Sequence, residues 1–181
     1  EGSPLTIANT KFIANRVASS NDHSSCIKIE NSPNVAIDSC TFSDNVDLGS
    51  RSAVIYVTSS SANIEVVNSI ILNNSYQNSN KFVFSASSSS NLKAYNDLNG
   101  NWWGNTAENY TVAPAVSACD NWLFLNVSTN VTSLSINKKV LITLDLNNQV
   151  TKDGTVTHDA VNLGNVKFDV KANGGVAKDS E

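Results

Sequence analysis

The strongest constraint on the fold is a sequence pattern that occurs four times. The copies read LTIANTKFIAN, VAIDSCTFSDN, IEVVNSIILNN and LKAYNDLNGNW, and they begin at Leu5, Val35, Ile64 and Leu92. Their starts are therefore about 30 residues apart, and the spacing shortens slightly from one copy to the next. A period in this range is typical of proteins built by stacking similar units, in which each unit contacts its neighbours. Such a stack presents a long exposed wall and does not need an enclosed pocket.

Each copy opens with alternating apolar residues, such as Leu5 and Ile7, which predicts a short β-strand with one buried face. A further strand is predicted later in the first three units, over residues 27–29, 55–57 and 82–84. No helical pattern separates these strands. Equivalent strands can then pair in parallel only if the chain coils, with successive turns about 4.8 Å apart. We therefore expect an all-β fold, a parallel β-helix of about four rungs, one for each copy of the pattern.

Asparagine and serine recur at matching positions of the units and support this interpretation. One column of such residues follows the first strand of each unit, and another precedes it. The members are Asn9, Ser39, Asn68 and Asn96 in the first column, and Asn34, Asn63 and Asn91 in the second. Asparagine tolerates the left-handed backbone of turns, and stacked amides can hydrogen-bond from one rung to the next.

The low charge of the chain excludes two classes of partner. Charged residues make up 15% of the 181 residues, and the formal net charge is −4. Nucleic acids are bound by basic surfaces, so we expect no nucleic-acid partner. Direct membrane contact by this segment is not expected either, because the chain has neither a Lys/Arg cluster nor a run of about eighteen apolar residues.

The three cysteines, Cys26, Cys40 and Cys119, do not have the spacing of metal ligands. Two interpretations stay open for them: small buried apolar side chains, or one disulfide whose members the sequence does not identify. Asn-x-Ser/Thr sequons, which are possible glycosylation sites in a secreted protein, are also present. They occur at Asn73, Asn109, Asn126 and Asn130.

The fourth unit departs from the pattern and leads into the segment Asn101–Asn105, with the sequence NWWGN. A stack of rungs has open ends that must be covered. We therefore predict that this segment caps the C-terminal end of a first domain spanning residues 1–118. Trp102 and Trp103 have two interpretations: they shield the end of the core, or they bind a ligand by stacking on a sugar ring.

The remaining residues, 119–181, show the patterns of antiparallel strands with one wet face. Apolar residues alternate over residues 123–127, 140–146 and 166–170, and turn signals stand at Asp153–Gly154 and Gly174–Gly175. This length holds about four or five strands, whereas an immunoglobulin-like sandwich has about seven. We therefore expect a second domain that is an incomplete β-sandwich, whose unpaired edges favour self-association.

Three segments carry a resemblance to a known family. They are Asn101–Asn105, Asp120–Leu125 with its Asn-Trp-Leu motif, and Gly164–Phe168, which is similar to a Gly-x-x-Val-x-Phe strand with Asn165 where proline is commoner. In this order they resemble the adhesin-like surface proteins of methanogenic archaea, and more broadly the pectate-lyase-like β-helix superfamily. The resemblance implies a right-handed parallel β-helix followed by a partial immunoglobulin-like β-sandwich, at the extracellular cell surface.

A search for catalytic, cofactor-binding and metal-binding residues finds only weak candidates. Enzymes with β-helix folds need acids and bases gathered on neighbouring rungs, and the charged residues of this chain are sparse. The sharpest group is His23 with Asp47 or Arg51, in the loops of adjacent units; the alternative is that these loops are simply solvated. No phosphate loop, metal spacing or nucleophile motif is present, so we expect no cofactor.

Two functions are therefore expected as alternatives. The first is a non-catalytic segment of a cell-surface adhesin, which binds a glycan or protein of another cell or presents a surface to it. The second is a fragment of a carbohydrate-active enzyme, a polysaccharide lyase, hydrolase or epimerase. In this second interpretation the chain is a piece of a longer protein, and the catalytic rungs precede Glu1.

Overall fold

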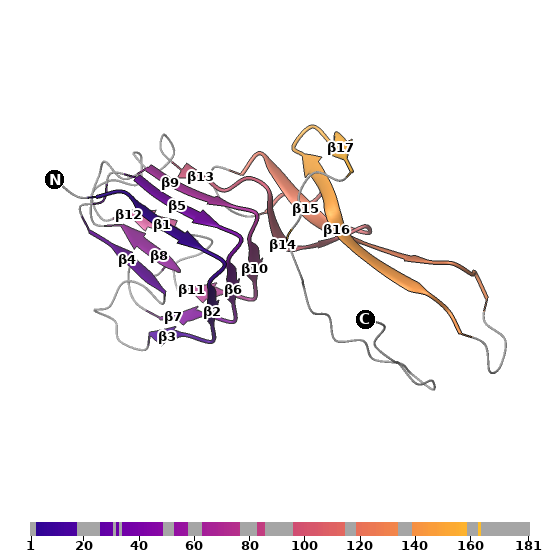
Figure 1. The fold of residues 1–181 in the computed structure, drawn as a ribbon, viewed down its shortest axis with the longest axis horizontal. Helices are drawn as coiled ribbons and strands as arrows, with labels where there is room; N and C mark the ends of the chain where they lie inside the picture. Colours follow the sequence, from indigo (N-terminus) through magenta and orange to yellow (C-terminus); the bar gives the residue numbers. More distant parts are fainter. Residues whose placement is uncertain are drawn as a thin grey trace.

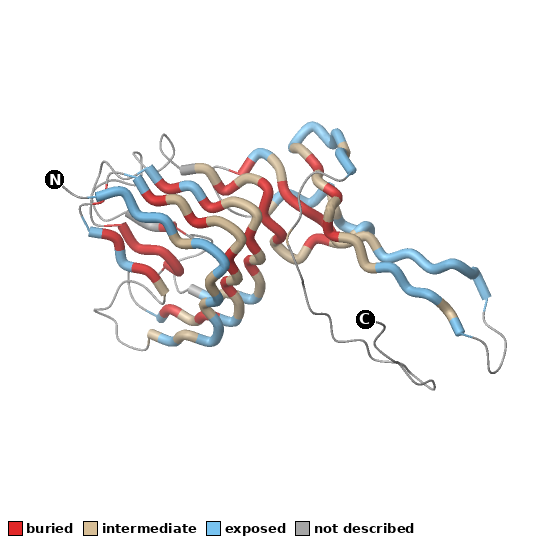
Figure 2. Tube along the Cα trace, viewed as in Figure 1, coloured by how far each residue is buried: buried red, intermediate tan, exposed pale blue. Residues whose placement is uncertain are grey.

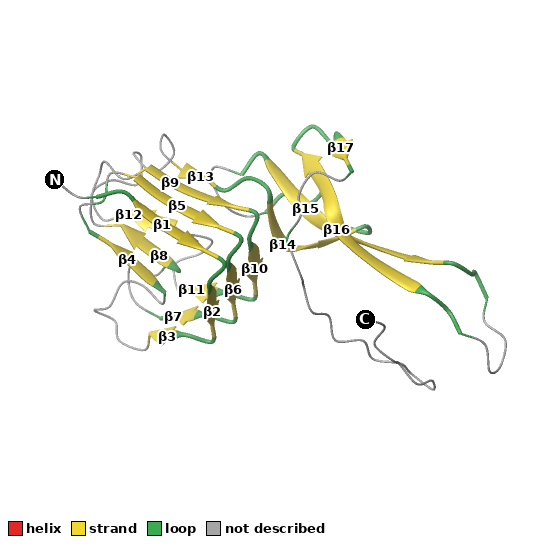
Figure 3. Cartoon of the chain, in the orientation of Figure 1, coloured by secondary structure: helices red, strands yellow, loops and turns green. Residues whose placement is uncertain are grey.

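The fold of the chain, in a computed structural model, is all-β, as the sequence predicts. The structure describes residues 3–17, 26–30, 32, 34–48, 53–57, 63–76, 83–85, 96–114, 119–133, 139–158 and 163. Within these ranges there are seventeen strands and no helix (Figures 1 and 3).

Equivalent strands of successive units pair in parallel and form several sheets. One sheet contains β1 (Leu5–Ala8), β5 (Asn34–Asp38), β9 (Asn63–Val67) and β13 (Asn96–Asp97). A second contains β3 (Arg16–Val17), β7 (Val46–Asp47) and β11 (Ser75–Tyr76), and a third contains β4 (Ile27–Ile29), β8 (Ile55–Val57) and β12 (Val83–Ser85). A fourth sheet starts from β2 (Lys11–Ile13), β6 (Thr41–Ser43) and β10 (Ile70–Leu72). Figure 1 shows these strands stacked side by side in the N-terminal half.

The register between the first three units is the one that the repeat predicts. Ile7 pairs with Ile37, and Ile37 pairs with Val66. In the next sheet Phe12 pairs with Phe42, and their rings stack at 4.9 Å between centroids. Equivalent apolar side chains therefore lie in files that cross neighbouring strands.

Side chains from these sheets form one buried cluster. Ile29, Ile37, Phe42 and Ile64 are members, each from a different strand, and all are nearly inaccessible to solvent. Figure 2 shows the alternation of buried and exposed residues along these strands. Each fully buried side chain of this size contributes about 1.5–3 kcal/mol of transfer free energy, so the files of apolar residues are the main source of stability in this half.

Two turns in each unit use left-handed backbone. The turn after the first strand has φ values of 51°, 54° and 51° at Asn9, Ser39 and Asn68, which confirms the predicted column for these three units. A second column, which the sequence did not predict, follows the second strand at Ala14, Asp44 and Asn73, with φ values of 55°, 58° and 53°. Left-handed backbone costs roughly 1–2 kcal/mol for residues other than glycine, so the surrounding strand pairing must offset that cost.

The predicted alignment of the fourth unit is wrong by four residues. Asn96 pairs with Ile64 and not with the Asn68 column, so the step from the third unit to the fourth is longer than the repeat predicts. This register places Leu98 in the core and gives the left-handed turn to Gly100, with a φ of 66°. The buried position suits Leu98 better than Ala94, and the left-handed turn suits Gly100 better than Asn96, which the predicted alignment places there. Asn91 and Leu92 lie outside the described residues.

The fourth sheet extends well beyond the repeated units. β14 (Asn101–Thr106) pairs in parallel with β10 on one side and with β15 (Asn121–Thr129) on the other. β15 then pairs antiparallel with β16 (Ile142–Thr151), and β16 with β17 (Val156–Thr157), so this sheet has seven strands. The sheet is continuous across residue 118, where the sequence predicts a domain boundary; the boundary stays a prediction.

The second half contains two of the predicted antiparallel strands. β15 contains the alternating pattern at residues 123–127, and β16 overlaps the pattern at residues 140–146 from Ile142 onward. The two strands form the long ribbon that projects from the sheets (Figure 1). The turn predicted at Asp153–Gly154 is confirmed, with a φ of 85° at Gly154. The strand predicted at residues 166–170 and the turn at Gly174–Gly175 lie outside the described residues.

Candidate functional site

A ladder of asparagine side chains joins the first three units from inside. Asn15 Nδ2 donates to Asn45 Oδ1 at 2.9 Å, and Asn45 Nδ2 donates to Asn74 Oδ1 at 2.8 Å. The same two oxygens accept the backbone N–H groups of Asn15 and Asn45. Asn45 Nδ2 also donates to the carbonyl oxygen of Phe12 at 2.9 Å. Amide bonding from one unit to the next is therefore present, but in a column that belongs to neither of the two predicted ones.

A second polar connection links the third unit to the fourth. Asn101 Oδ1 accepts the backbone N–H of Ser69 at 2.9 Å, and its Nδ2 donates to the carbonyl oxygens of Val66 and Leu98. Asn101 and Ser69 are both fully buried. Buried polar groups cost free energy unless they are paired, so these residues specify the register of the units and are not available to a ligand.

The outer face of the β1-β5-β9-β13 sheet carries three carboxylates, which we call the acidic row: Asp38, Glu65 and Asp97. Glu65 pairs directly with Asp97, and Asp38 lies on the neighbouring strand two residues beyond the partner of Glu65. Asp38 Oδ1 accepts hydrogen bonds from Asn68 Nδ2 at 2.9 Å and from Ser39 Oγ at 3.0 Å. Sequence reasoning missed this row because the fourth unit was aligned four residues away from its actual register.

The acidic row does not form a metal centre. In the parts of the chain that the structure describes, no group of three or more His, Cys, Asp or Glu side chains is arranged to hold a metal ion. Asp97 Oδ1 accepts the backbone N–H of Asn99 at 2.9 Å, which ties one oxygen to the turn before Gly100. The row is therefore a negatively charged strip on an open sheet face and not an enclosed site.

Asp47, one of the weak candidates from the sequence, is fully buried at the end of β7. Its Oδ2 accepts the backbone N–H of Ala53 at 3.2 Å, so the carboxylate anchors the loop between β7 and β8. His23 and Arg51, its expected neighbours, lie outside the described residues. The grouping of the three side chains stays a prediction.

Trp102 and Trp103 lie on β14, between β10 and β15, and not at a free end of the sheet. Trp102 is 8% exposed, and its indole N–H donates to the carbonyl oxygen of Asn105 at 2.9 Å. Trp103 is half-buried and packs against the main core. Trp102 therefore has no ring face open to a sugar, which favours the core-shielding interpretation of the pair.

The four sequons lie at different places on the surface. Asn73, Asn109 and Asn130 are exposed, whereas Asn126 is half-buried on β15. Asn109 Oδ1 accepts the backbone N–H of Thr106, and Asn130 Oδ1 accepts that of Leu141. These bonds use the amide oxygen, whereas a glycan is attached to the nitrogen, so the three exposed sites are compatible with modification.

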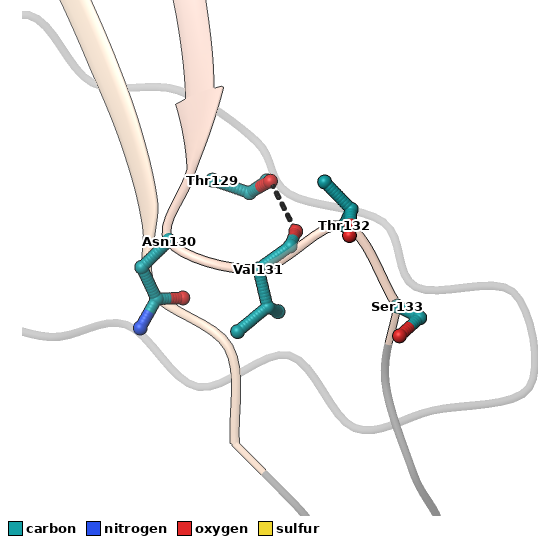
Figure 4. Close-up of a pocket in the computed structure, with 5 residues that line it drawn as sticks. All are labelled: Thr129, Asn130, Val131, Thr132 and Ser133. Carbon is teal, nitrogen blue, oxygen red and sulfur yellow. Dashed lines mark hydrogen bonds between the residues drawn. The ribbon is translucent and has the colours of Figure 1, made fainter.

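An open hollow lies at the end of the β15–β16 ribbon, lined by residues 129–133 (Figure 4). Thr129 Oγ1 donates to the carbonyl oxygen of Val131 at 2.7 Å, which holds the chain in a tight bend. The hydroxyls of Thr132 and Ser133 and the amide of Asn130 surround Val131. The described residues that line the hollow offer hydrogen-bonding groups, and none of these five has a titratable side chain, so they suit recognition better than catalysis.

A polar chain near the base of the ribbon links Asp145, Asn148 and His158. Asn148 is buried, and its Nδ2 donates to Asp145 Oδ2 at 3.0 Å. His158 Nδ1 lies 2.6 Å from Asn148 Oδ1, so the imidazole donates through Nδ1. His158 is exposed, and its ring is oriented by the buried amide of Asn148.

None of the three cysteines forms a disulfide. Cys40 and Cys119 are buried, and Cys26 is half-buried near Asn15. Burial raises the pKa of the Cys40 thiol, and it raises the pKa of Cys119 to about 12 although Lys152 acts in the opposite direction. The interpretation as small buried apolar side chains therefore fits Cys40 and Cys119.

This pKa shift predicts a loss of stability at alkaline pH. Because the folded-state pKa of Cys119 lies above the unfolded value, its contribution is complete below about pH 9 and is lost as the pH rises toward 12. Between those limits the free energy of unfolding should fall by about 1.4 kcal/mol per pH unit more in the wild type than in Cys119→Ala. Urea unfolding from pH 8 to 10.5 measures both slopes, and equal slopes would contradict the assignment.

Three comparisons of the chain, with models of protein families, with curated proteins and with solved structures, gave no match. The search for membrane spans, made over the described residues, found no helix that is long and apolar enough to cross a bilayer.

Proposed function

We propose that this chain is a non-catalytic segment of an extracellular, cell-surface adhesin. In this proposal, residues 1–118 form a right-handed parallel β-helix, and residues 119–181 belong to a partial immunoglobulin-like β-sandwich. The partner is a glycan or a protein on the surface of another cell. The handedness, the sandwich and the cell-surface location come from the resemblance of the sequence to adhesin-like proteins.

The observation that carries the proposal is the in-register parallel pairing of equivalent strands. Ile55 pairs with Val83, and Ile70 pairs with Trp102, so each strand contacts the equivalent strand of the next unit. Units that stack in this way, joined by the buried ladder of Asn15, Asn45 and Asn74, make a stiff and extended body. Such a body suits a protein that holds a binding surface away from the cell.

The surface chemistry favours recognition over reaction. Apart from the acidic row, the charges include an ion pair between the exposed side chains of Lys28 and Glu30 at the end of β4, with 2.6 Å between Nζ and Oε1. The hollow at residues 129–133 adds further hydrogen-bonding groups at the end of a projecting ribbon. Binding by exposed groups of this kind relies on hydrogen bonds and shape.

The test is retention of the fluorescently labelled chain on a glycan panel and on whole microbial cells. We expect saturable binding to at least one of these surfaces, displaced by unlabelled chain and lost after thermal unfolding. Two surface variants locate the binding region: Thr132→Ala with Ser133→Ala at the ribbon end, and Glu65→Gln with Asp97→Asn in the acidic row. Absence of saturable binding on every surface would count against the adhesin function.

The acidic row supports a second candidate function, a carbohydrate-active enzyme of which this chain is a part. Carboxylates on adjacent strands of one sheet face are the groups that such chemistry requires, and Glu65 and Asp97 are paired in register. Incubation with uronate polymers, with and without calcium, tests it through the release of reducing or unsaturated ends. Turnover that Glu65→Gln and Asp97→Asn abolish would favour the enzyme over the adhesin.

A further inference from the structure

The turn between β13 and β14 contains an Asn-Gly pair, Asn99 and Gly100. In such a pair the backbone nitrogen of the glycine follows directly after the side-chain amide of the asparagine. Glycine has no side chain to obstruct the approach of these two groups. Asn99 is half-buried, so water reaches it, and Gly100 is buried. The turn therefore holds an amide that can react with its own backbone.

The amide oxygen of Asn99 is held by two backbone donors at the start of β15. Asn99 Oδ1 accepts the N–H of Asp120 at 2.6 Å and the N–H of Asn121 at 3.1 Å. Two N–H groups on one carbonyl oxygen are the arrangement that stabilises the negative charge of a tetrahedral intermediate. They therefore make Cγ of Asn99 more susceptible to attack by a nucleophile.

The nucleophile next to this amide is the backbone nitrogen of Gly100, and Asn121 restrains it. Gly100 N–H donates to Asn121 Oδ1 at 2.8 Å and to the carbonyl oxygen of Asn121 at 3.2 Å. Asn121 Oδ1 also accepts from Gln149 Nε2 at 2.7 Å, which fixes its position. The N–H must leave both oxygens before the nitrogen can lose its proton and attack, so these hydrogen bonds slow the reaction.

An aspartate at position 99 can keep the contacts that the asparagine makes. Both hydrogen bonds of the Asn99 side chain use its oxygen, and no described residue accepts a hydrogen bond from its Nδ2. A carboxylate accepts from backbone N–H groups more strongly than a neutral amide does. Loss of the nitrogen therefore removes no described contact of this turn.

We propose that Asn99 is a site of spontaneous deamidation and that Asn121 controls the rate. In the first step the Gly100 nitrogen bonds to Asn99 Cγ and the Cγ–Nδ2 bond breaks, so the Gly100 proton and the NH₂ group leave together as ammonia. In the second step water opens the cyclic imide to aspartate or isoaspartate and returns a proton to the Gly100 nitrogen. Water is the co-reactant. The reaction adds one negative charge two residues after Asp97 of the acidic row.

Incubation of the full chain at about pH 8.5, followed by proteolysis and mass spectrometry, measures the conversion of amide to carboxyl in the peptide that contains Asn99. We expect the folded wild type to convert about tenfold more slowly than the chain in urea, because the hydrogen bonds of Gly100 must open first. Folded Asn121→Ala should convert about tenfold faster than the wild type, because Gly100 loses its closer acceptor.

Asn121→Asp is the matched control. It keeps an oxygen acceptor for Gly100 N–H and for Gln149 Nε2, so it should convert at the wild-type rate. Amide exchange in β5 and β9 reports whether each variant is folded. If Asn121→Ala does not fold, Gln149→Ala takes its place, because it removes the donor that fixes Asn121 Oδ1 and should also speed the conversion.

Four results would overturn the proposal. The first is no conversion of Asn99 in the folded wild type, and the second is equal conversion in the folded wild type and in urea. The third is a folded Asn121→Ala, or the Gln149→Ala that replaces it, that converts no faster than the wild type. The fourth is an Asn121→Asp that converts as fast as Asn121→Ala.

Discussion

Replacing Asn45 with alanine is expected to lower the free energy of unfolding by about 3 kcal/mol, because buried groups lose their partners. Asn45 is completely buried, and its amide pairs with the Asn15 backbone and side chain, the Phe12 carbonyl and Asn74 Oδ1. Alanine leaves at least two of these part-buried groups without a partner, and each such group costs about 1–3 kcal/mol. The loss of stability therefore comes more from the neighbouring polar groups that lose their hydrogen-bond partner than from the missing side chain itself.

Urea unfolding followed by circular dichroism measures this loss, and two variants serve as controls. Asn63→Ala removes an exposed amide at the start of β9 and should change stability by less than about 0.5 kcal/mol. Asn45→Asp keeps the shape but places an acceptor against the Phe12 carbonyl and Asn74 Oδ1, so it should destabilise at least as much as alanine near neutral pH. If Asn45→Ala lowered the free energy of unfolding no more than Asn63→Ala does, the stabilising role of the asparagine ladder would be refuted.

Trp122→Ala is expected to cost about 3–5 kcal/mol, the range for removing a large aromatic side chain from a core. Trp122 is 1% exposed and belongs to the same buried cluster as Ile37 and Phe42, although it comes from β15. Its indole N–H donates to the Tyr110 carbonyl oxygen at 2.7 Å. The substitution creates a cavity and leaves that carbonyl unpaired at the place where the second half of the chain joins the repeated units.

The unfolding free energy of Trp122→Ala should be compared with that of Val112→Ala. Val112 is 62% exposed, and its truncation should cost less than about 0.5 kcal/mol. Hydrogen exchange shows which part of the chain is destabilised. Amides of β15 should lose more protection than those of β5, because Trp122 attaches β15 to the core. Equal loss in both strands would show that the two halves unfold as one unit, and a cost near that of Val112→Ala would exclude a core role for Trp122.

The repeat could be predicted from the sequence because local periodicity fixes both the strands and their partners. Ile7, Ile37 and Val66 each stand at the same place in an alternating pattern, so one register buries all of them and a shift of one residue exposes all of them. Asn9, Ser39 and Asn68 were predictable as turn residues from their place after the first strand, where asparagine tolerates positive φ.

The fourth unit could not be aligned in this way. Its sequence offers Leu92 and Ala94 at the periodic positions. Only the pairing of Asn96 with Ile64 shows that Leu98 enters the core and that Gly100 forms the left-handed turn. The same register pairs Trp102 with Ile70. The acidic row was missed with it, because Asp97 faces Glu65 only in the actual register. The parallel pairing of β14 with β15 was equally unpredictable, since no repeat relates these strands.

The sequence alone determined the all-β class, the first and the last strand of each of the first three units with their register, and the presence of strands near β15 and β16, because each depends on a short pattern of side chains along one segment. The tertiary structure decided which polar residues are buried, which strand lies on each side of Trp102, and which carboxylates share a face. These depend on contacts between segments distant in sequence, such as Asn15 with Asn45 and Trp122 with Tyr110. The free energy of such a contact is set by both partners together, so no single segment of the sequence reveals it.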